Sequence, residues 1–200
     1  MNLGIQSYCT FNSKGIFKNG KPIILNQNLS FNDFALKVYK QFEIGYSKYH
    51  KMDNLCKLAL LTSEFLLDNG QVLVDTPSSE VAIILGNSSS SIVSDTIHQT
   101  SMDELPSPAV FVYTLPNIMI GEMCIKYKIT GENSCFQMKD FDTSFLNQYV
   151  SYLFDKEKYT YCITGWVDFD GEDYQAHLFL ISNENKDTIS IFNDKIKNLI

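Results

Sequence analysis

Residues 117–140 read NIMIGEMCIKYKITGENSCFQMKD, and the stretch ends on a carboxylate, Asp140, shortly before a predicted helix. Apolar residues that recur every three or four positions predict this helix: Phe145, Leu146, Tyr149, Val150, Leu153 and Phe154. Asp142 and Thr143 are residue types that cap helix N-termini. A carboxylate near a first turn is stabilised by ~0.3–1 kcal/mol, so Asp140 fits a helix entry without a further role.

Strands and helices alternate along the rest of the chain. Periodic apolar positions predict helices over Phe31–Phe42, over about Ile92–Gln99, and from a cap at Asp53 to a stop at Asn69-Gly70. Apolar or alternating runs predict strands at Ile5–Phe11, Ile23–Leu25, Val81–Leu85, Tyr159–Thr164, Ala176–Ile181 and Thr188–Phe192, with a turn around Lys18–Pro22. The pattern predicts one α/β domain over residues 1–200 with a mixed sheet.

Composition excludes several classes of partner. The chain has 200 residues, 44% hydrophobic and 20% charged, values typical of one globular domain with a sizeable core. Its net charge is −7 and it contains no arginine, so neither counterion release on nucleic acid nor bidentate phosphate recognition is expected. Leu105–Pro108 is a rigid connection within the domain rather than a linker.

The cysteines and the N-terminus indicate a reducing, cytoplasmic location. Five cysteines are an odd number, and most of their neighbours are apolar or small, so buried free thiols are expected. The N-terminus lacks the pattern of a signal peptide, and no apolar run reaches membrane-spanning length. We therefore expect no membrane association.

Two loops could suggest a bound ion, but neither fits. Gly86-Asn87 followed by Ser88–Ser91 has one glycine and no following lysine, so it does not match a phosphate loop. The run from Asp168 to Asp173 has its glycine at the fourth position, and its twelfth residue is Phe179, unlike a calcium loop. The histidines, His50, His98 and His177, form no metal-ligand pattern. The sequence predicts no metal and no cofactor.

Four blocks of sequence resemble, in order, the N-terminal half of a β-ketoacyl synthase of the thiolase-like superfamily. They cover roughly residues 50–185. The blocks are Lys51–Ala59 (KMDNLCKLA), Val81–Gly86, the set Pro108, Phe111, Pro116, Asn117, Gly121, Ile125, Tyr127, Ile129 and Gly131, and Tyr161–Asp168 (YCITGWVD). The intervals from Asn117 to Gly121 and from Gly121 to Gly131 match the family spacing.

By this resemblance, Asp140 occupies the position of the catalytic cysteine. Counting forward from Gly131 and backward from Gly165 leads to the same residue. A condensing enzyme needs a thiolate there to carry the acyl chain, and a carboxylate cannot form that thioester. Glu132 stands where the family prefers proline, and Trp166 replaces a second glycine. The family's second half, with its two assisting histidines, has no counterpart in the 200 residues, so no catalytic residue is expected.

The resemblance implies a thiolase-like half-fold with a mixed, mostly parallel five-stranded sheet and helices on both faces. It also implies a noncatalytic role similar to the chain-length-factor-like partners of ketosynthases in aryl polyene and flexirubin-type pigment clusters. Such a subunit forms a heterodimer with a complete ketosynthase and meets acyl carrier protein only indirectly. The strand Ser134, Cys135, Phe136, Gln137 and Met138 would pair across the dimer. Leu115, Ile118 and Met119 would line or cap the partner's acyl tunnel.

Other interpretations remain at this point. Asp140 could orient the partner's substrate. Cys135 could serve a small thiol-dependent acyltransferase or hydrolase, although a strand cysteine lacks a helix N-terminus to lower its pKa. A homodimeric docking module for carrier protein is a third interpretation. The acidic composition disfavours that module, because carrier proteins are acidic too and like charges resist association.

Overall fold

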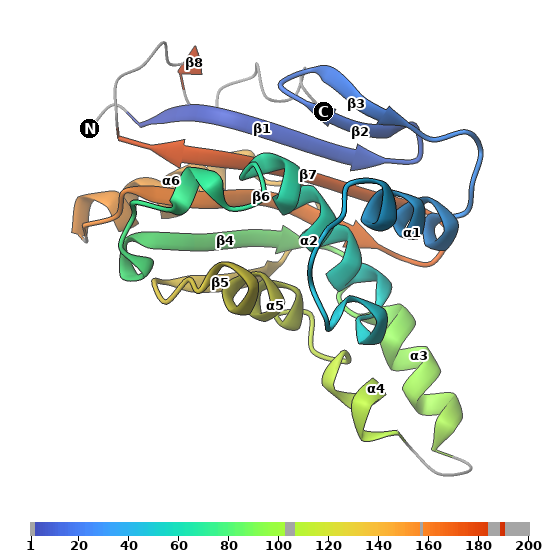
Figure 1. Cartoon of the computed structure of the whole chain (residues 1–200). Coiled ribbons are helices and arrows are strands. Elements are labelled where there is room, and N and C mark those ends of the chain that lie inside the picture. Colours follow the sequence, from blue (N-terminus) through green and yellow to red (C-terminus); the bar gives the residue numbers. More distant parts are fainter. Residues whose placement is uncertain (1–2, 103–106, 157, 184–188, 191–200) are drawn as a thin grey trace.

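A single sheet forms the centre of the structure, a computed structural model that describes residues 3–102, 107–156, 158–183 and 189–190 (Figure 1). Its strand order is β3-β2-β1-β7-β6-β4-β5, and β8 pairs with β1. The strands are β1 Gly4–Asn12, β2 Gly15–Lys18, β3 Lys21–Leu25, β4 Val81–Asn87, β5 Asn133–Gln137, β6 Tyr161–Phe169, β7 Tyr174–Ser182 and β8 Ile189–Ser190. The remainder of the predicted strand Thr188–Phe192 lies outside the described residues, as do residues 105 and 106.

The sheet differs from the expected five mostly parallel strands. In the part of the chain that the structure describes it has eight strands, of which only β4–β5 and β4–β6 are parallel pairs. β1, β2 and β3 pair antiparallel with one another because the connections between them are too short for a crossover, and β1 joins them to β7, also antiparallel. Asn19 and Gly20 both have positive φ, as the predicted turn between β2 and β3 requires.

Helices cover both faces of the sheet, as expected. The helices are α1 Phe31–Gln41, α2 Asn54–Leu66, α3 Ile92–Ser101, α4 Pro108–Val112, α5 Ile118–Tyr127 and α6 Thr143–Lys156, with short 3₁₀ turns at Tyr49–Lys51, Gln71–Leu73 and Ser78–Glu80. Residues of α1, α2 and α5 belong to one core cluster, and those of α6 belong to the other. Figure 1 shows α2 and α5 across the front of the sheet, while α3 and α4 extend away from it.

Alternation along β4 explains how one strand serves both cores. Val81, Ile83 and Leu85 belong to the cluster under α2 and α5, whereas Ala82 and Ile84 belong to the cluster under α6. Successive strand side chains point to opposite faces, so the apolar run Val81–Leu85 is buried on both sides. The prediction of a fully buried strand is confirmed.

The ends of α2 also follow the predicted chemistry. Asp53 Oδ1 accepts a hydrogen bond from the backbone N–H of Cys56 at 2.9 Å, as an N-cap should. Its other oxygen accepts from the Ser94 hydroxyl at 2.7 Å, which ties α2 to α3. Beyond the C-terminus, Asn69 and Gly70 take positive φ and end the helix. No helix in the described part of the chain combines the length and apolarity needed to cross a membrane.

His177 is a buried titratable group on the α6 side of the sheet. Its exposure is 3%, its ring lies parallel to that of Phe141 at 6.5 Å, and its Nδ1 lies 3.3 Å from the Thr10 hydroxyl. Burial disfavours the charged imidazolium and lowers the pKa of His177 to about 4. The folded state therefore holds a neutral ring at neutral pH.

We predict that this histidine makes the folded state sensitive to acid. Below the unfolded pKa of about 6.5 the unfolded chain binds a proton that the folded chain does not, until the pH nears the folded value. As the pH is lowered from about 6.5 toward about 4, this group should therefore decrease the free energy of unfolding, by up to ~1.4 kcal/mol per pH unit. Urea unfolding across this interval should show a shallower pH slope for His177→Gln. The exposed His50→Gln should keep the native slope, and equal slopes for all three proteins would contradict the prediction.

Candidate functional site

Asp140 lies in the turn between the end of β5 and the start of α6, at the carboxyl ends of the parallel strands. Its side chain is exposed, and it makes no hydrogen bond or ion pair within the described residues. The helix cap is Asp142, whose Oδ1 accepts from the backbone N–H of Phe145 at 2.9 Å. The two carboxylates thus differ in role: Asp142 holds the first turn of α6, and Asp140 is available at the surface.

Aromatic side chains fill the layer between this turn and the sheet. Phe141 follows Asp140 directly, and its ring centroid lies 5.7 Å from that of Trp166 and 6.4 Å from that of Phe179. Trp166, which stands where the resemblance expects glycine, is 3% exposed. A Cβ on Gly86 would lie 2.4 Å from the Met138 methyl and 2.9 Å from the Trp166 ring. Gly86 therefore makes room on β4 for these two large side chains.

An open hollow of about 460 Å³ adjoins Asp140 on the outer side of β5. It is lined by Phe136, Gln137, Met138, Lys139, Asp140, Asp142 and Phe145. The ring of Phe136 packs edge-on against Phe145 at 4.8 Å, which gives the hollow an apolar floor under a charged rim. The structure thus brings three predicted strand residues together with Asp140.

The tunnel candidates lie at different depths. Leu115 is 51% exposed just before α5, and Ile118, in the first turn of that helix, is partly buried. Met119 is fully buried in the core that the chain builds for itself beneath α5. The structure therefore leaves Leu115 accessible to another chain and places Met119 behind it.

The thiols are poor nucleophiles in this fold. Burial raises the pKa of Cys135 to about 11 and that of Cys9 to about 12. Burial also raises the pKa of Cys56, Cys124 and Cys162 above the usual thiol range. Reactive cysteines have lowered pKa values, so the raised pKa of Cys135 disfavours its thiolate at neutral pH.

The histidines do not supply a base for these thiols. His50 lies in the 3₁₀ turn before α2, His98 on α3 and His177 on β7. Among the described residues, their ring and hydrogen-bond contacts reach aromatic, Thr and Gln side chains and no cysteine. No Cys–His pair forms around Cys135.

Sequence reasoning missed a clamp on the serine loop. Asp168, near the end of β6, accepts five hydrogen bonds from the last residue of β4 and from the loop that follows it. The donors are the backbone N–H and hydroxyl groups of Ser88 and Ser89 and the Asn87 side-chain amide, at 2.6–3.1 Å. In a phosphate-binding loop, backbone N–H groups of this kind point toward the bound anion. Here the N–H groups of Ser88 and Ser89 donate to the Asp168 carboxylate instead. About 80 residues separate the partners, so no local pattern could reveal the contact.

The acidic run after Asp168 is a turn between β6 and β7, as predicted. Asp170 Oδ1 accepts from the backbone N–H groups of Glu172 and Asp173, at 2.9 and 2.8 Å. Within the described residues, no group of three or more His, Cys, Asp or Glu side chains is placed to hold a metal ion. The run is a hydrogen-bonded turn in which Asp170 satisfies local backbone donors.

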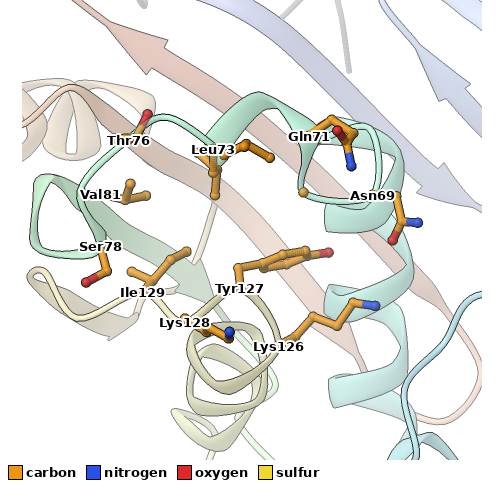
Figure 2. Close-up of a pocket in the computed structure, with 12 residues that line it drawn as sticks. Asn69, Gln71, Leu73, Thr76, Ser78, Val81, Lys126, Tyr127, Lys128 and Ile129 are labelled. Atoms are coloured by element: carbon orange, nitrogen blue, oxygen red, sulfur yellow. The ribbon is translucent and has the colours of Figure 1, made fainter.

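A second cavity, of about 490 Å³, opens at the other end of β4 (Figure 2). The ring of Tyr127 lies along it, and its hydroxyl donates to Glu64 Oε1 at 2.5 Å and contacts the Ser63 hydroxyl at 3.0 Å. Lys126 pairs with the same Glu64 oxygen at 3.2 Å. Tyr127 and Lys126 thus pair with α2 and fasten α5 to that helix. The cavity lies about 20 Å from Asp140 along the strand direction, given ~3.3 Å per strand residue.

We predict that the Asp168 clamp stabilises the carboxyl end of β4. Asp168→Ala leaves several part-buried donors without their acceptor and should lower the free energy of unfolding by about 2–4 kcal/mol. Glu172→Ala, in the exposed turn, is the matched control and should change it by no more than about 0.5 kcal/mol. Denaturant unfolding measures both, and similar values for the two variants would show that the loop does not depend on Asp168.

No family model and no curated protein matches the sequence. Solved structures match over nearly the whole chain. A chain of the ishigamide ketosynthase/chain length factor aligns with a TM-score of 0.68 and 16% identity, over 95% of this chain and 64% of that one. A ketosynthase in complex with its chain length factor from Xenorhabdus doucetiae gives 0.57 and 14%, over 92% and 80%.

A third match is a type II polyketide acyl carrier protein in complex with its hexaketide-bound ketosynthase, with a TM-score of 0.63 and 9% identity, over 90% of this chain and 62% of that one. The chain thus spans less than two thirds of the length of two of these three proteins. At such identities the likeness is one of fold. The chain has the thiolase-like fold found in ketosynthase and chain length factor proteins.

Proposed function

We propose that the chain is a noncatalytic, chain-length-factor-like subunit that pairs with a complete β-ketoacyl synthase. The observation that carries this proposal is Asp140, which follows β5 and precedes α6 where the fold's condensing enzymes need a thiolate. The buried Trp166 and the partly buried Phe141 support the same conclusion, because they occupy the layer between that turn and the sheet. The raised pKa of Cys135 disfavours a thiol-dependent acyltransferase or hydrolase.

The edge strand β5 supports pairing with another subunit. It bonds to β4 on one side only and ends the sheet. Glu132 O accepts from Ile83 N–H, and Met138 N–H donates to Asn87 O, so even-numbered residues of this segment bond to β4. Alternation then directs the backbone groups of Asn133, Cys135 and Gln137 to the open edge. An unpaired edge of this kind is a template for another strand.

In the proposed pair, β5 forms hydrogen bonds with an edge strand of the ketosynthase. Leu115 then caps the partner's acyl tunnel. Ile118 supports Leu115 from the first turn of α5, and Met119 holds that turn to the core. Acyl carrier protein would meet the ketosynthase and not this chain. The pathway we propose is of the aryl polyene or flexirubin type. Two structural neighbours support a role of this kind, since they are complexes or pairs of ketosynthase and chain length factor.

A thiol at position 140 should not create a condensing enzyme. We expect Asp140→Cys to give no condensation product above background, because catalytic groups that act as a unit leave little activity when other members are missing. The assay uses the full purified chain with acyl and malonyl groups on carrier protein. Asp155→Cys, an exposed aspartate on α6, is the matched control. Product from Asp140→Cys alone would overturn the noncatalytic assignment.

The pairing itself is tested by affinity purification. The tagged chain, expressed in its native cells, should bring down a complete ketosynthase in equal amount, identified by mass spectrometry. Washing with moderate salt should leave the pair intact, since strand pairing and apolar contact are only weakly screened. A chain that is recovered without any ketosynthase would contradict the proposal.

A further inference from the structure

The cavity of about 490 Å³ at the amino end of β4, here called the Tyr127 cavity, has one wall formed by the Tyr127 ring (Figure 2). The Tyr127 hydroxyl donates to Glu64 and lies 3.0 Å from the Ser63 hydroxyl, so two contacts with α2 fix the ring. The loop after α2 adjoins the same ring: a Cβ on Gly70, whose φ is +84°, would lie 3.4 Å from it. The aromatic wall is therefore held in place by the chain itself.

A second wall is fixed by close backbone contacts between the segment after α5 and the segment before β4. Thr130 N–H donates to Ser78 O at 2.9 Å, and the hydroxyls of these two residues lie 3.1 Å apart. A Cβ on Gly131 would lie 2.3 Å from Val81 O, so a side chain at this position would prevent the approach. These contacts shape the hollow without filling it. Its volume falls within the range of about 300–1,000 Å³ that is typical of preformed ligand pockets.

The floor of the Tyr127 cavity is apolar and its mouth is polar. Val81 and Ile129 are almost fully buried, and Leu73 is partly buried. Amide and hydroxyl side chains line the more exposed part: Asn69, Gln71, Thr76 and Ser78. Figure 2 shows the flat Tyr127 ring between Leu73 and Gln71 above and Lys126 and Lys128 below. A fixed aromatic face beside apolar side chains suits a flat, apolar ligand.

The charge at the Tyr127 cavity is opposite in sign to that of the whole chain. Both charged side chains that line it are lysines, Lys126 and Lys128, although the net charge of the protein is −7. Lys126 pairs with Glu64 at 3.2 Å, so its charge is balanced. Lys128 is exposed, and its side chain makes no hydrogen bond or ion pair within the described residues. One unbalanced positive charge therefore lies at the mouth.

The helix dipole accounts for only part of this charge. Lys128 is the C-cap of α5, and the C-terminus of a helix carries about half a negative charge, which a whole ammonium exceeds. Its backbone has a φ of +58°, a left-handed conformation that glycine or asparagine usually adopts at a helix end. Local conformation therefore gives no reason for a lysine at this position, whereas a ligand of negative charge does.

We propose that the Tyr127 cavity binds a small organic anion with a flat, apolar body, such as an aromatic carboxylate. The body of the ligand lies against the Tyr127 ring and covers Val81 and Ile129. Its carboxylate accepts a charge-assisted hydrogen bond from the Lys128 ammonium. The cavity lies about 20 Å from Asp140, at ~3.3 Å per strand residue, so this site does not depend on the pairing that we propose at β5.

The test compares two probes that differ only in charge, 2-naphthoate and 2-naphthamide, by NMR titration of the full native chain. The acid should bind at one site with a dissociation constant of about 1 mM or tighter, as expected for a ligand of this size. Backbone amide signals of residues 69–76 and 127–129 should shift. The amide should bind about fivefold more weakly, because it offers no negative charge to Lys128.

A variant of Lys128 assigns this preference to one side chain. Lys128→Met keeps the length of the side chain and removes its charge, and the exposed position should leave folding unchanged. The variant should bind the two probes equally, with the native affinity for the amide. Lys40→Met is the matched control, because it removes an exposed lysine from the last turn of another helix, α1, and it should retain the preference for the acid.

Three results would overturn the proposal. The first is saturable binding whose signal shifts lie outside residues 69–76 and 127–129, or no saturable binding at all. The second is equal affinity of the native chain for the acid and the amide. The third is a preference for the acid that survives in Lys128→Met. The first two are measured on the native chain, so they hold whether or not the variant folds.

Discussion

The burial of β4 between two layers of helices is the constraint on which the rest of the structure depends. Every side chain from Val81 to Asn87 is buried, and the strand pairs with β5 on one side and β6 on the other. Because its odd and even positions face different cores, β4 holds α2 and α5 on one face and α6 on the other. Its carboxyl end therefore sets where the serine loop, the end of β6 and the turn with Asp140 meet.

Large side chains and a hydrogen-bonded loop fill the carboxyl end of β4. Trp166, Phe141 and Met138 fill the space above Gly86, and Asp168 binds the donors of the serine loop. A nucleophile needs a lowered pKa and room for an acyl group, whereas this end of the sheet offers a surface carboxylate above an aromatic layer. The noncatalytic role that we propose would thus rest on a group of mutually fitted residues rather than on Asp140 alone.

Two features of the described chain that lack a partner lie at the β5 side of the sheet. Among the described strands β5 pairs on one side only, and α5 exposes Ile125 and carries Gly121 within the helix. Each is costly in an isolated chain, the first because open edges invite aggregation and the second because glycine weakens a helix. The first cost is recovered if a second subunit continues the sheet.

Helices and strands that are specified by apolar periodicity and by capping residues could be predicted from the local sequence. The apolar period of α2 and α6, the caps at Asp53 and Asp142 and the continuous run of β4 could all be predicted, because each depends on residues within a few turns of one another. The position of Asp140 between strand and helix followed from spacing. The helix α5 was less visible, since apolar residues on several of its sides obscure the period.

Contacts between distant segments decided the remainder. The antiparallel joining of the N-terminal hairpin to β7, the Asp168 clamp across about 80 residues and the burial that lowers the pKa of His177 and raises that of Cys135 arise only when separate elements pack. The sequence by itself determined that a carboxylate, Asp140, stands between a strand and a helix, where the resemblance expects a nucleophile. Only the tertiary structure decided that the layer beneath it is closed and the edge beside it is open, because burial and strand order are properties of the assembled sheet.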